Sequence, residues 1–253
     1  MTDDFKITDW PSTPEEKRWH RFLQAATNKW GYEQVRAADV YALFDERVAL
    51  NLPEFETLAP GRHQHSVDGE IVQIIRLNPL KGAMYRIGYG MLLTFMPVES
   101  GAKLKRGRLS AQSNYSLWDE PREVEARKSA PAITMLNPLN DTDLIRGVHN
   151  LHGRGFVQHT LEHHWRHMLP AMTAWFRVNT TIDALLETAL KQSTDPNFST
   201  HHPRPSLVAA FLLARLGQLA EAERQLETWA AKGGLWKAPL TAWQDHLRQA
   251  ASP

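Results

Sequence analysis

One stretch, residues 69–97, limits the possible folds more than any other part of the chain. Its first half is a β-branched and aliphatic run that is too short for a helix and stops at Asn78 and Pro79. In its second half, residues 83–95, every second side chain is apolar or aromatic. A period of two with one wholly apolar face is typical of a strand that covers a core. The stretch therefore predicts two long antiparallel strands joined by a turn at 78–82.

The other face of the second strand carries two glycines, Gly88 and Gly90. Glycine weakens a strand, so such a pair marks a bend, a bulge, or the close approach of another backbone or a ligand. Two interpretations stay open. One is a bend, and the other is a shallow binding groove over Gly88 and Gly90 that Arg76 and Arg86 flank.

Helix patterns surround this hairpin on the N-terminal side. Thr13 and Pro14 are typical of a helix start, and Gly31 ends the apolar repeat that follows. We expect this helix to cover the apolar face of the second strand. A second helix is expected at 33–48, and residues 51–67 are expected to be mainly loop because they hold two prolines and a polar end.

The last hundred residues read as helices. We expect helices at 155–169 and 171–191 with an interruption at Pro170, a helical hairpin that begins at Ser206, and a final helix at 241–250. The hairpin resembles a single tetratricopeptide unit. Such repeats need about three copies to share a core, so two ordinary antiparallel helices explain the pattern better.

The fold class that these patterns predict is α+β, an antiparallel meander sheet with N-terminal helices followed by an all-helical C-terminal region. A chain of 253 residues is long enough for two modest domains with buried cores. We place an α+β domain at 1–145 and a helical domain at 146–253.

Composition narrows the classes of function. The chain has 29 basic and 28 acidic residues, and this balance argues against nucleic acid as a partner. Cysteine is absent, which excludes disulfides and thiol catalysis. No apolar run reaches the ~18 residues of a membrane helix, and the acidic N-terminus is not a secretory signal. We expect a cytoplasmic protein with no membrane partner.

Histidines form the most conspicuous candidate site. His159, His163 and His167 are spaced four apart, so they share one face of the predicted helix. Neighbours in this series can bind one zinc ion or another divalent metal, but the outer two lie about 12 Å apart along the axis. The candidates for a further ligand are His149, His152 and Glu162. The order of residues differs from the zincin motif, and a polar helix face explains the pattern without metal, so no cofactor is predicted.

Two shorter candidates remain. Gly153 and Gly155 flank Arg154 at the start of the same helix, where backbone N–H groups converge, so His152 and Arg154 form an anion-binding candidate. A flexible turn explains these residues as well.

The basic run 103–108 lies near aromatic residues, as in proteins that bind single-stranded nucleic acid. It is short, however, and a solvated loop is the more common interpretation.

The LFDER segment and the hairpin sequence VDGEIVQIIRLNPLKGAMYRIGYGMLLTFMP resemble uncharacterised bacterial domains of unknown function. Gln73 and Tyr85–Tyr89 carry the likeness, which covers about the first half of the chain. Such relatives are met beside bacterial toxin systems, so the resemblance implies an immunity or accessory role. It brings no catalytic residues, and the helical second half lies outside it.

The sequence contains none of the common signatures of a serine nucleophile, a P-loop or a dinucleotide site. We therefore expect a non-enzymatic bacterial protein that binds another protein, as a toxin immunity protein or an adaptor. The alternative is a metal-dependent hydrolase that uses the histidine-rich helix with His159, His163 and His167.

Overall fold

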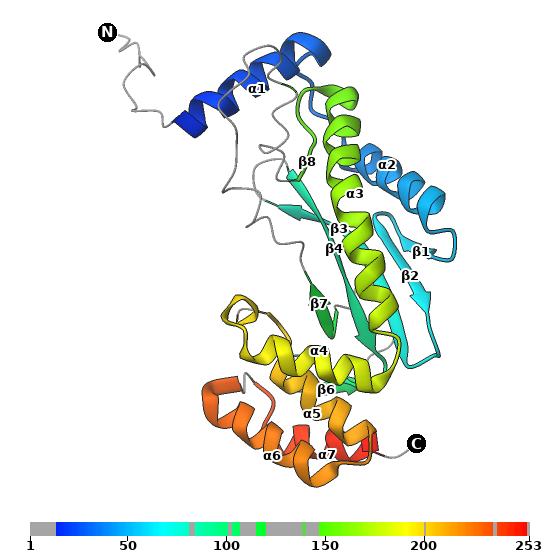
Figure 1. Ribbon diagram of the computed structural model, residues 1–253, viewed down its shortest axis with the longest axis vertical. Helices are drawn as coiled ribbons and strands as arrows, with labels where there is room; N and C mark the ends of the chain where they lie inside the picture. The colour runs from blue at the N-terminus through cyan, green and yellow to red at the C-terminus, as the bar shows by residue number, and fades with distance from the viewer. Residues whose placement is uncertain are drawn as a thin grey trace. The chain divides into compact units, whose positions relative to one another are not determined.

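The computed structural model describes residues 14–80, 84–100, 103–106, 115–119, 139, 147–199, 201–234 and 237–251. Its α-helices are α1 (Pro14–Trp30), α2 (Ala37–Asn51), α3 (Gly153–Val178), α4 (Ile182–Thr194), α5 (Pro205–Arg215), α6 (Leu219–Trp229) and α7 (Leu240–Ala251) (Figure 1). Its strands are β1 (Glu56–Ala59), β2 (Arg62–Ser66), β3 (Ile71–Leu80), β4 (Met84–Leu93), β5 (Pro97–Ser100), β6 (Lys103–Arg106), β7 (Leu117–Asp119) and β8 (Val148–His149).

The main sheet has the strand order β1-β2-β3-β4-β7, and the short strand β8 also pairs with β4. The first four strands follow one another in sequence, as a meander does. A separate two-stranded sheet consists of β5 and β6. Two helices precede the sheet and a run of helices follows it, which confirms the predicted α+β class.

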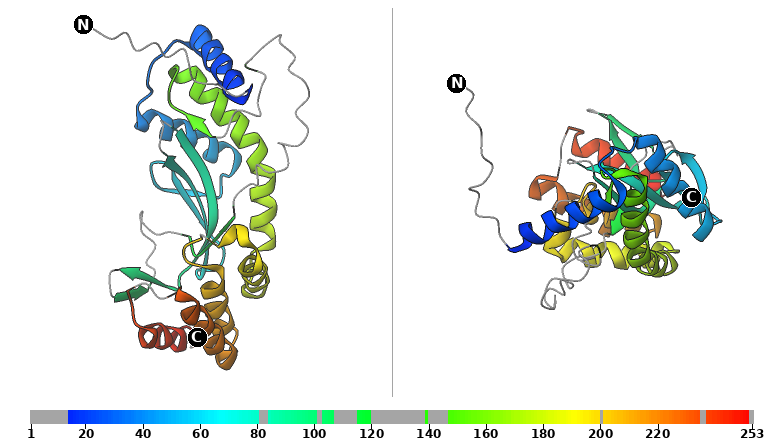
Figure 2. Two further views of the ribbon diagram at one scale, coloured as in Figure 1. Left: turned by 90° about the vertical axis from the view of Figure 1, so that its left-hand side faces the viewer. Right: turned by 90° about the horizontal axis from the view of Figure 1, so that it is seen from above.

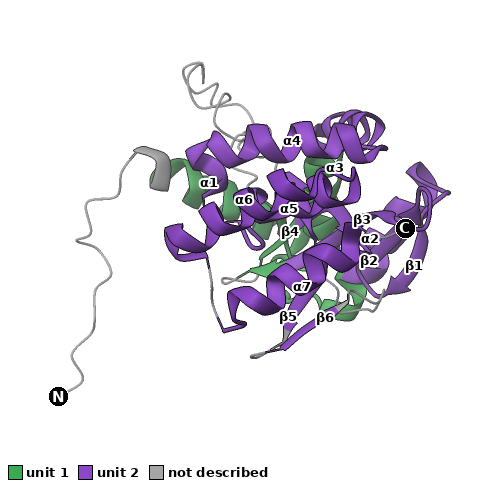
Figure 3. Cartoon of the chain, turned by 90° about the horizontal axis from the view of Figure 1, so that it is seen from below, with its two compact units in different colours: residues 1–40, 79–86, 122–166 green, residues 41–78, 87–121, 167–253 purple. Residues whose placement is uncertain are grey.

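The chain divides into two compact units, coloured separately in Figure 3. Unit 1 consists of Met1–Val40, Pro79–Arg86 and Arg122–Arg166, and unit 2 consists of Tyr41–Asn78, Ile87–Pro121 and His167–Pro253. Each unit is built from three separate stretches of sequence. The boundary near residue 145 that the sequence suggests stays a prediction.

β3 and β4 confirm the two long neighbouring strands predicted within 69–97, and residues 81–83 of the predicted turn region lie outside the described part. β3 and β4 are both extended, and β3 continues through Asn78 and Pro79, which the sequence assigned to a turn. Alternate side chains of β4 form the expected apolar face, and its two tyrosines, Tyr85 and Tyr89, are buried. The rings that meet Tyr89 belong to Trp175 and Phe176 of α3.

Residues 51–67 correct the prediction of a loop, because they contain β1 and β2. β1 has only four residues and β2 is polar at every position, so neither strand shows an alternating hydrophobic pattern. Gly61 makes the tight turn between them with a positive φ of 72°, a conformation that glycine adopts at little cost.

Pro170 does not interrupt the helix, contrary to expectation: α3 is continuous from Gly153 to Val178 (Figure 2). The break comes instead at Asn179, whose side-chain amide donates to the carbonyl of Trp175 at 2.9 Å. Thr181 then caps α4 by accepting the N–H of Ala184. These polar contacts, rather than proline, end α3.

Unit 1 has its own apolar core at the start of α3. Phe22 and Ala26 of α1 and Phe156 of α3 are buried there, and Trp19 and Trp30 pack around them. The apolar stripe of α1, which the sequence predicted from its helical spacing, therefore has a partner within unit 1.

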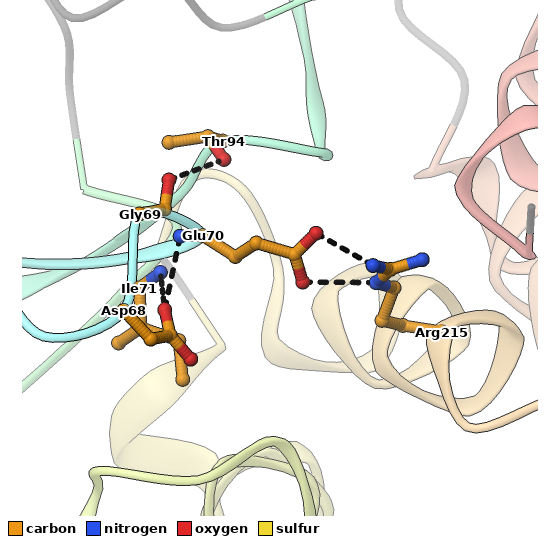
Figure 4. A network of polar contacts seen from close by, with 6 residues as sticks. All are labelled: Asp68, Gly69, Glu70, Ile71, Thr94 and Arg215. Atoms are coloured by element: carbon orange, nitrogen blue, oxygen red, sulfur yellow. Dashed lines mark hydrogen bonds and ion pairs between the residues drawn. The ribbon is translucent and has the colours of Figure 1, made fainter. Parts of the chain in front are cut away.

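In unit 2, the start of β3 is tied to α5 by a two-pronged ion pair. Both carboxylate oxygens of Glu70 face the guanidinium of Arg215, at 2.6 and 2.9 Å (Figure 4). Asp68 caps the turn before β3 by accepting the N–H groups of Glu70 and Ile71. Planar pairing of this kind is stronger than a single contact between point charges.

Candidate functional site

The face of β4 that carries Gly88 and Gly90 is covered by residues of the same chain. A Cβ at Gly90 would lie 2.6 Å from the carbonyl oxygen of Leu117, and one at Gly88 would lie 2.9 Å from the hydroxyl of Tyr115. The glycines are therefore required by the close approach of another backbone and an aromatic ring, one of the outcomes that glycine in a strand predicts.

Arginines gather beside this contact in unit 2. Arg62 of β2 lies opposite Arg76 of β3 in the ladder, and the Arg76 guanidinium lies 4.2 Å from the centre of the Tyr115 ring. Burial lowers the pKa of Arg62, and the charge of Arg76 lowers it further. Burial also raises the pKa of Tyr115, so this phenol stays neutral. Arg86, the other predicted rim residue, belongs to unit 1.

An aromatic stack continues from Tyr115 within unit 2. Trp118 lies nearly parallel to Tyr115 at 6.3 Å, and His201 lies flat against Trp118 at 3.5 Å. Burial lowers the pKa of His201 to about 4, so its ring is neutral at pH 7. The stack links β7 to the segment before α5.

In unit 1, the anion-binding candidate lies in a tightly bonded segment before α3. His152 has a positive φ of 66°, and its Nδ1 lies 2.9 Å from the hydroxyl of Thr27. That hydroxyl donates to the carbonyl of Leu23, so Nδ1 of His152 donates to it. Burial lowers the pKa of His152, which keeps its ring uncharged.

The glycines around Arg154 have a packing role. A Cβ at Gly153 would lie 2.9 Å from the carbonyl oxygen of Trp30, and Gly155 lies against the Trp30 ring itself. Arg154 is exposed beside them. The segment that suggested an anion site is therefore also the place where α1 and α3 meet.

His149 is also buried in this segment. Its ring lies 5.4 Å from that of Trp19 and 5.9 Å from that of Phe156. Burial, with a smaller effect of His152, lowers its pKa to about 4. Its backbone N–H donates to the hydroxyl of Thr160, whereas its Nε2 has no hydrogen-bond partner among the described residues.

The three histidines proposed as metal ligands differ in their surroundings. His159 is half-buried against Trp30, and burial, followed by the charge of Lys29, lowers its pKa. His163 is half-buried and His167 is exposed. Within the described parts of the chain, no group of three or more histidine or acidic side chains is placed to hold a metal ion. Zinc binding stays a prediction.

The basic run forms part of the β5–β6 hairpin. Lys103 and Lys105 are exposed, whereas Leu104 between them is half-buried. Arg106 pairs with Pro97 on the neighbouring strand. Lys103 and Lys105 therefore share one face of β6, whereas the side chain of Arg106 and residues 107–108 lie outside the described part.

The structure also brings together three residues that the sequence did not single out. The carboxylate of Asp45 lies 2.8 Å from Nε2 of His63, and Nδ1 of His63 lies 3.2 Å from the hydroxyl of Thr57. Asp45 also accepts the N–H of Gly61 at 2.9 Å. We call Asp45, His63 and Thr57 the histidine relay.

Hydrogen-bond chemistry fixes the direction of this relay. An ionised carboxylate only accepts, so Nε2 of His63 carries the proton and Nδ1 is left with a lone pair. The Thr57 hydroxyl therefore donates to Nδ1. Burial lowers the pKa of His63, although Asp45 opposes this effect, so the ring is neutral at pH 7.

No family model, curated protein or solved structure matches this chain. Of the helices that the structure describes, none is both long enough and apolar enough to cross a membrane. The candidate sites therefore have to be judged on their geometry.

Proposed function

We propose that the chain is a protein-binding protein, an adaptor or immunity protein, whose partner surface centres on Tyr32 in unit 1. The observation that carries this proposal is the exposure of an aromatic side chain on a firmly held loop. Tyr32 is 71% exposed. Tyrosine is among the residues that contribute most at protein interfaces.

The loop that carries Tyr32 is held at both ends and in the middle. Gly31 donates its N–H to Thr27 at 2.8 Å where α1 ends. Val35 donates to the carbonyl of Asn150 at 2.7 Å, and the side chain of Asn150 donates back to Val35 at 3.2 Å. A loop already fixed in one conformation loses little entropy when a partner binds.

The backbone next to Tyr32 is also tied to the start of α3. Gly153 donates its N–H to the carbonyl of Glu33 at 2.8 Å. The edge of the Tyr32 ring meets His152 at 5.2 Å, so one side of the tyrosine rests on a buried group. Exposed Arg154 follows Gly153 directly. Tyrosine with arginine nearby is the composition typical of an interface centre.

The more specific role, immunity or adaptor, rests on the sequence resemblance to bacterial domains met beside toxin systems. In the immunity role, the partner would be a bacterial toxin. The metal-dependent hydrolase has less support, because the described part of the chain holds no group of three or more histidine or acidic side chains that could bind a metal ion.

Affinity capture with matched variants tests the proposal. The full chain is used as bait in extract of its native host, together with Tyr32→Ala and a control, Leu50→Ala, whose side chain is equally exposed at 72% but lies in unit 2. We expect a partner whose binding weakens about tenfold or more with Tyr32→Ala and is unchanged with Leu50→Ala. A partner that binds all three proteins equally, or no protein partner at all, would contradict the proposal.

A further inference from the structure

We infer that Thr57 is a nucleophilic hydroxyl that accepts an acyl group from an activated ester or thioester, with His63 as its base and Asp45 as the positioning residue. This inference concerns unit 2 and does not depend on the partner surface around Tyr32. It requires one acyl group per chain rather than turnover, so it is compatible with a binding protein.

The three side chains have the arrangement that such a hydroxyl needs. A nucleophile becomes reactive when a base lies within hydrogen-bond reach and a third group orients that base. Here Thr57 lies 3.2 Å from Nδ1 of His63, and Asp45 lies 2.8 Å from Nε2. The order of roles is that of a hydroxyl–histidine–carboxylate triad, which is recognised by geometry rather than by sequence position.

The fold holds the base still and leaves the hydroxyl accessible. Thr57 and His63 lie directly opposite each other in the β1–β2 ladder. His63 is only 1% exposed and packs edge-on against Phe44 of α2, whereas Thr57 is exposed. An imidazole that is fixed beside an accessible hydroxyl is better positioned to take its proton than a mobile surface histidine.

Asp45 is itself held in position. Its Oδ1 accepts both the N–H of Gly61 and the proton on Nε2 of His63. The Gly61 N–H is fixed by the turn between β1 and β2, so the carboxylate cannot swing away without losing that bond. The correct tautomer of His63, with its lone pair toward Thr57, is thus maintained by the backbone.

Other threonine hydroxyls of unit 2 have different partners. Thr228, which is also exposed, donates to the carbonyl of Arg224 at 2.8 Å. Thr94 donates to the carbonyl of Gly69 at 3.2 Å. A backbone carbonyl has no capacity to take up the hydroxyl proton as a base, so these residues serve as internal controls.

The reaction balances without a redox partner. Oγ1 of Thr57 attacks the carbonyl carbon of the acyl donor while its proton passes to Nδ1 of His63. The bond between that carbon and the leaving oxygen or sulfur then breaks, and His63 returns the proton to the leaving atom. The products are an acyl ester on Thr57 and a free alcohol or thiol.

Acetylation by p-nitrophenyl acetate tests this inference on the full chain. After a timed reaction near neutral pH, peptide mapping by mass spectrometry measures the acetylation rate at Thr57 and at Thr228. A positioned general base contributes about a hundredfold or more, so we expect Thr57 to react about a hundred times faster than Thr228. Equal rates at the two threonines would overturn the inference, and this comparison needs no variant.

Four variants separate a reactive hydroxyl from a merely accessible one. Thr57→Ser should retain acetylation at this position and Thr57→Val should abolish it, while Thr228→Val leaves it unchanged. Asp45→Asn should slow the reaction at residue 57 about a hundredfold. An unchanged rate in Asp45→Asn, in protein whose circular dichroism matches that of the wild type, would contradict the role of Asp45.

Discussion

Two buried histidines, one in each unit, show how differently the same side chain is used. His63 in unit 2 is bonded through both ring nitrogens, to the carboxylate of Asp45 and the hydroxyl of Thr57. His149 in unit 1 is nearly as buried at 5%, but its ring neighbours are Trp19 and Phe156. Burial alone therefore does not distinguish a candidate functional histidine from a core residue.

The partners of each ring set its chemistry. Burial lowers the pKa of both histidines, but at His63 the carboxylate of Asp45 opposes this effect. At His149 the smaller electrostatic effect of His152 acts in the same direction as burial. His63 is thus a neutral base with a defined tautomer, and His149 is an imidazole that resists protonation.

The largest expected effect tests whether His149 belongs to an apolar core. Phe156→Ala removes a fully buried ring that contacts Phe22 and Trp30 as well as His149. We expect the free energy of unfolding to fall by about 3–5 kcal/mol, measured by chemical denaturation. Leu190→Ala at an exposed position is the control and should change it by less than about 0.5 kcal/mol. Similar small losses for both would show that this core is loosely packed.

The second prediction concerns how the stability of the folded chain depends on pH through His149. The unfolded chain protonates His149 near pH 6.5, whereas the folded chain resists protonation until about pH 4. Between these values the unfolded state binds more protons, so stability falls as the pH is lowered from 6.5 to 4 and the effect is complete below pH 4.

His149→Leu should remove this contribution. When the pH falls from 7 to 4, the wild type should lose about 3 kcal/mol more unfolding free energy than the variant. The variant is therefore relatively more stable in acid. Denaturation curves at several pH values measure this. Parallel curves for the two proteins across the range would show that His149 titrates normally.

A smaller loss of stability is expected when residue 45 of the histidine relay loses its charge. Asp45→Asn removes an ionised acceptor that serves both Gly61 and His63. Hydrogen bonds to charged groups contribute about 1.5–3 kcal/mol, so we expect a loss of about 2 kcal/mol. Asp245→Asn, at an exposed position in α7, is the matched control. Equal effects of the two substitutions would mean that Asp45 does not hold His63.

The smallest loss of stability is expected at Glu70, whose carboxylate is more exposed than that of Asp45. Glu70→Gln breaks the two-pronged pair with Arg215 (Figure 4). Because both side chains are partly exposed, we expect a loss of about 1 kcal/mol or less, which decreases further in high salt. Unfolding curves at low and high salt measure it. A loss of stability larger than that of Asp45→Asn would contradict the prediction that Asp45 contributes more than Glu70.

The sequence predicted those parts of the fold that have a strong local pattern. The period-two face of β4, the start of α1 at Pro14 and the end of that helix before Gly31 are all confirmed. The glycine pair at 88 and 90 marks the close approach of another backbone, whereas the two interpretations drawn from the sequence were a bend and a binding groove. In each confirmed case one local signal, either periodicity or glycine, was sufficient.

The remainder depends on contacts between distant parts of the sequence. Asp45 lies in α2, whereas Thr57 and His63 lie in strands that the sequence pattern assigned to a loop. Only the β1–β2 register places Thr57 opposite His63. Residues 62–66 are polar at every position and show no strand periodicity, so the local sequence indicated neither a strand nor a partner for His63.

The tautomer of His63 is the most direct test of the hydrogen-bond directions in the histidine relay. Nitrogen-15 NMR of the full chain, with His63 assigned by comparison with a variant at that position, distinguishes a protonated from an unprotonated ring nitrogen. We predict a neutral ring at pH 7 with the proton on Nε2 and an unprotonated Nδ1 that accepts the hydroxyl of Thr57. A proton on Nδ1 instead would contradict the relay and, with it, the reactivity inferred for Thr57.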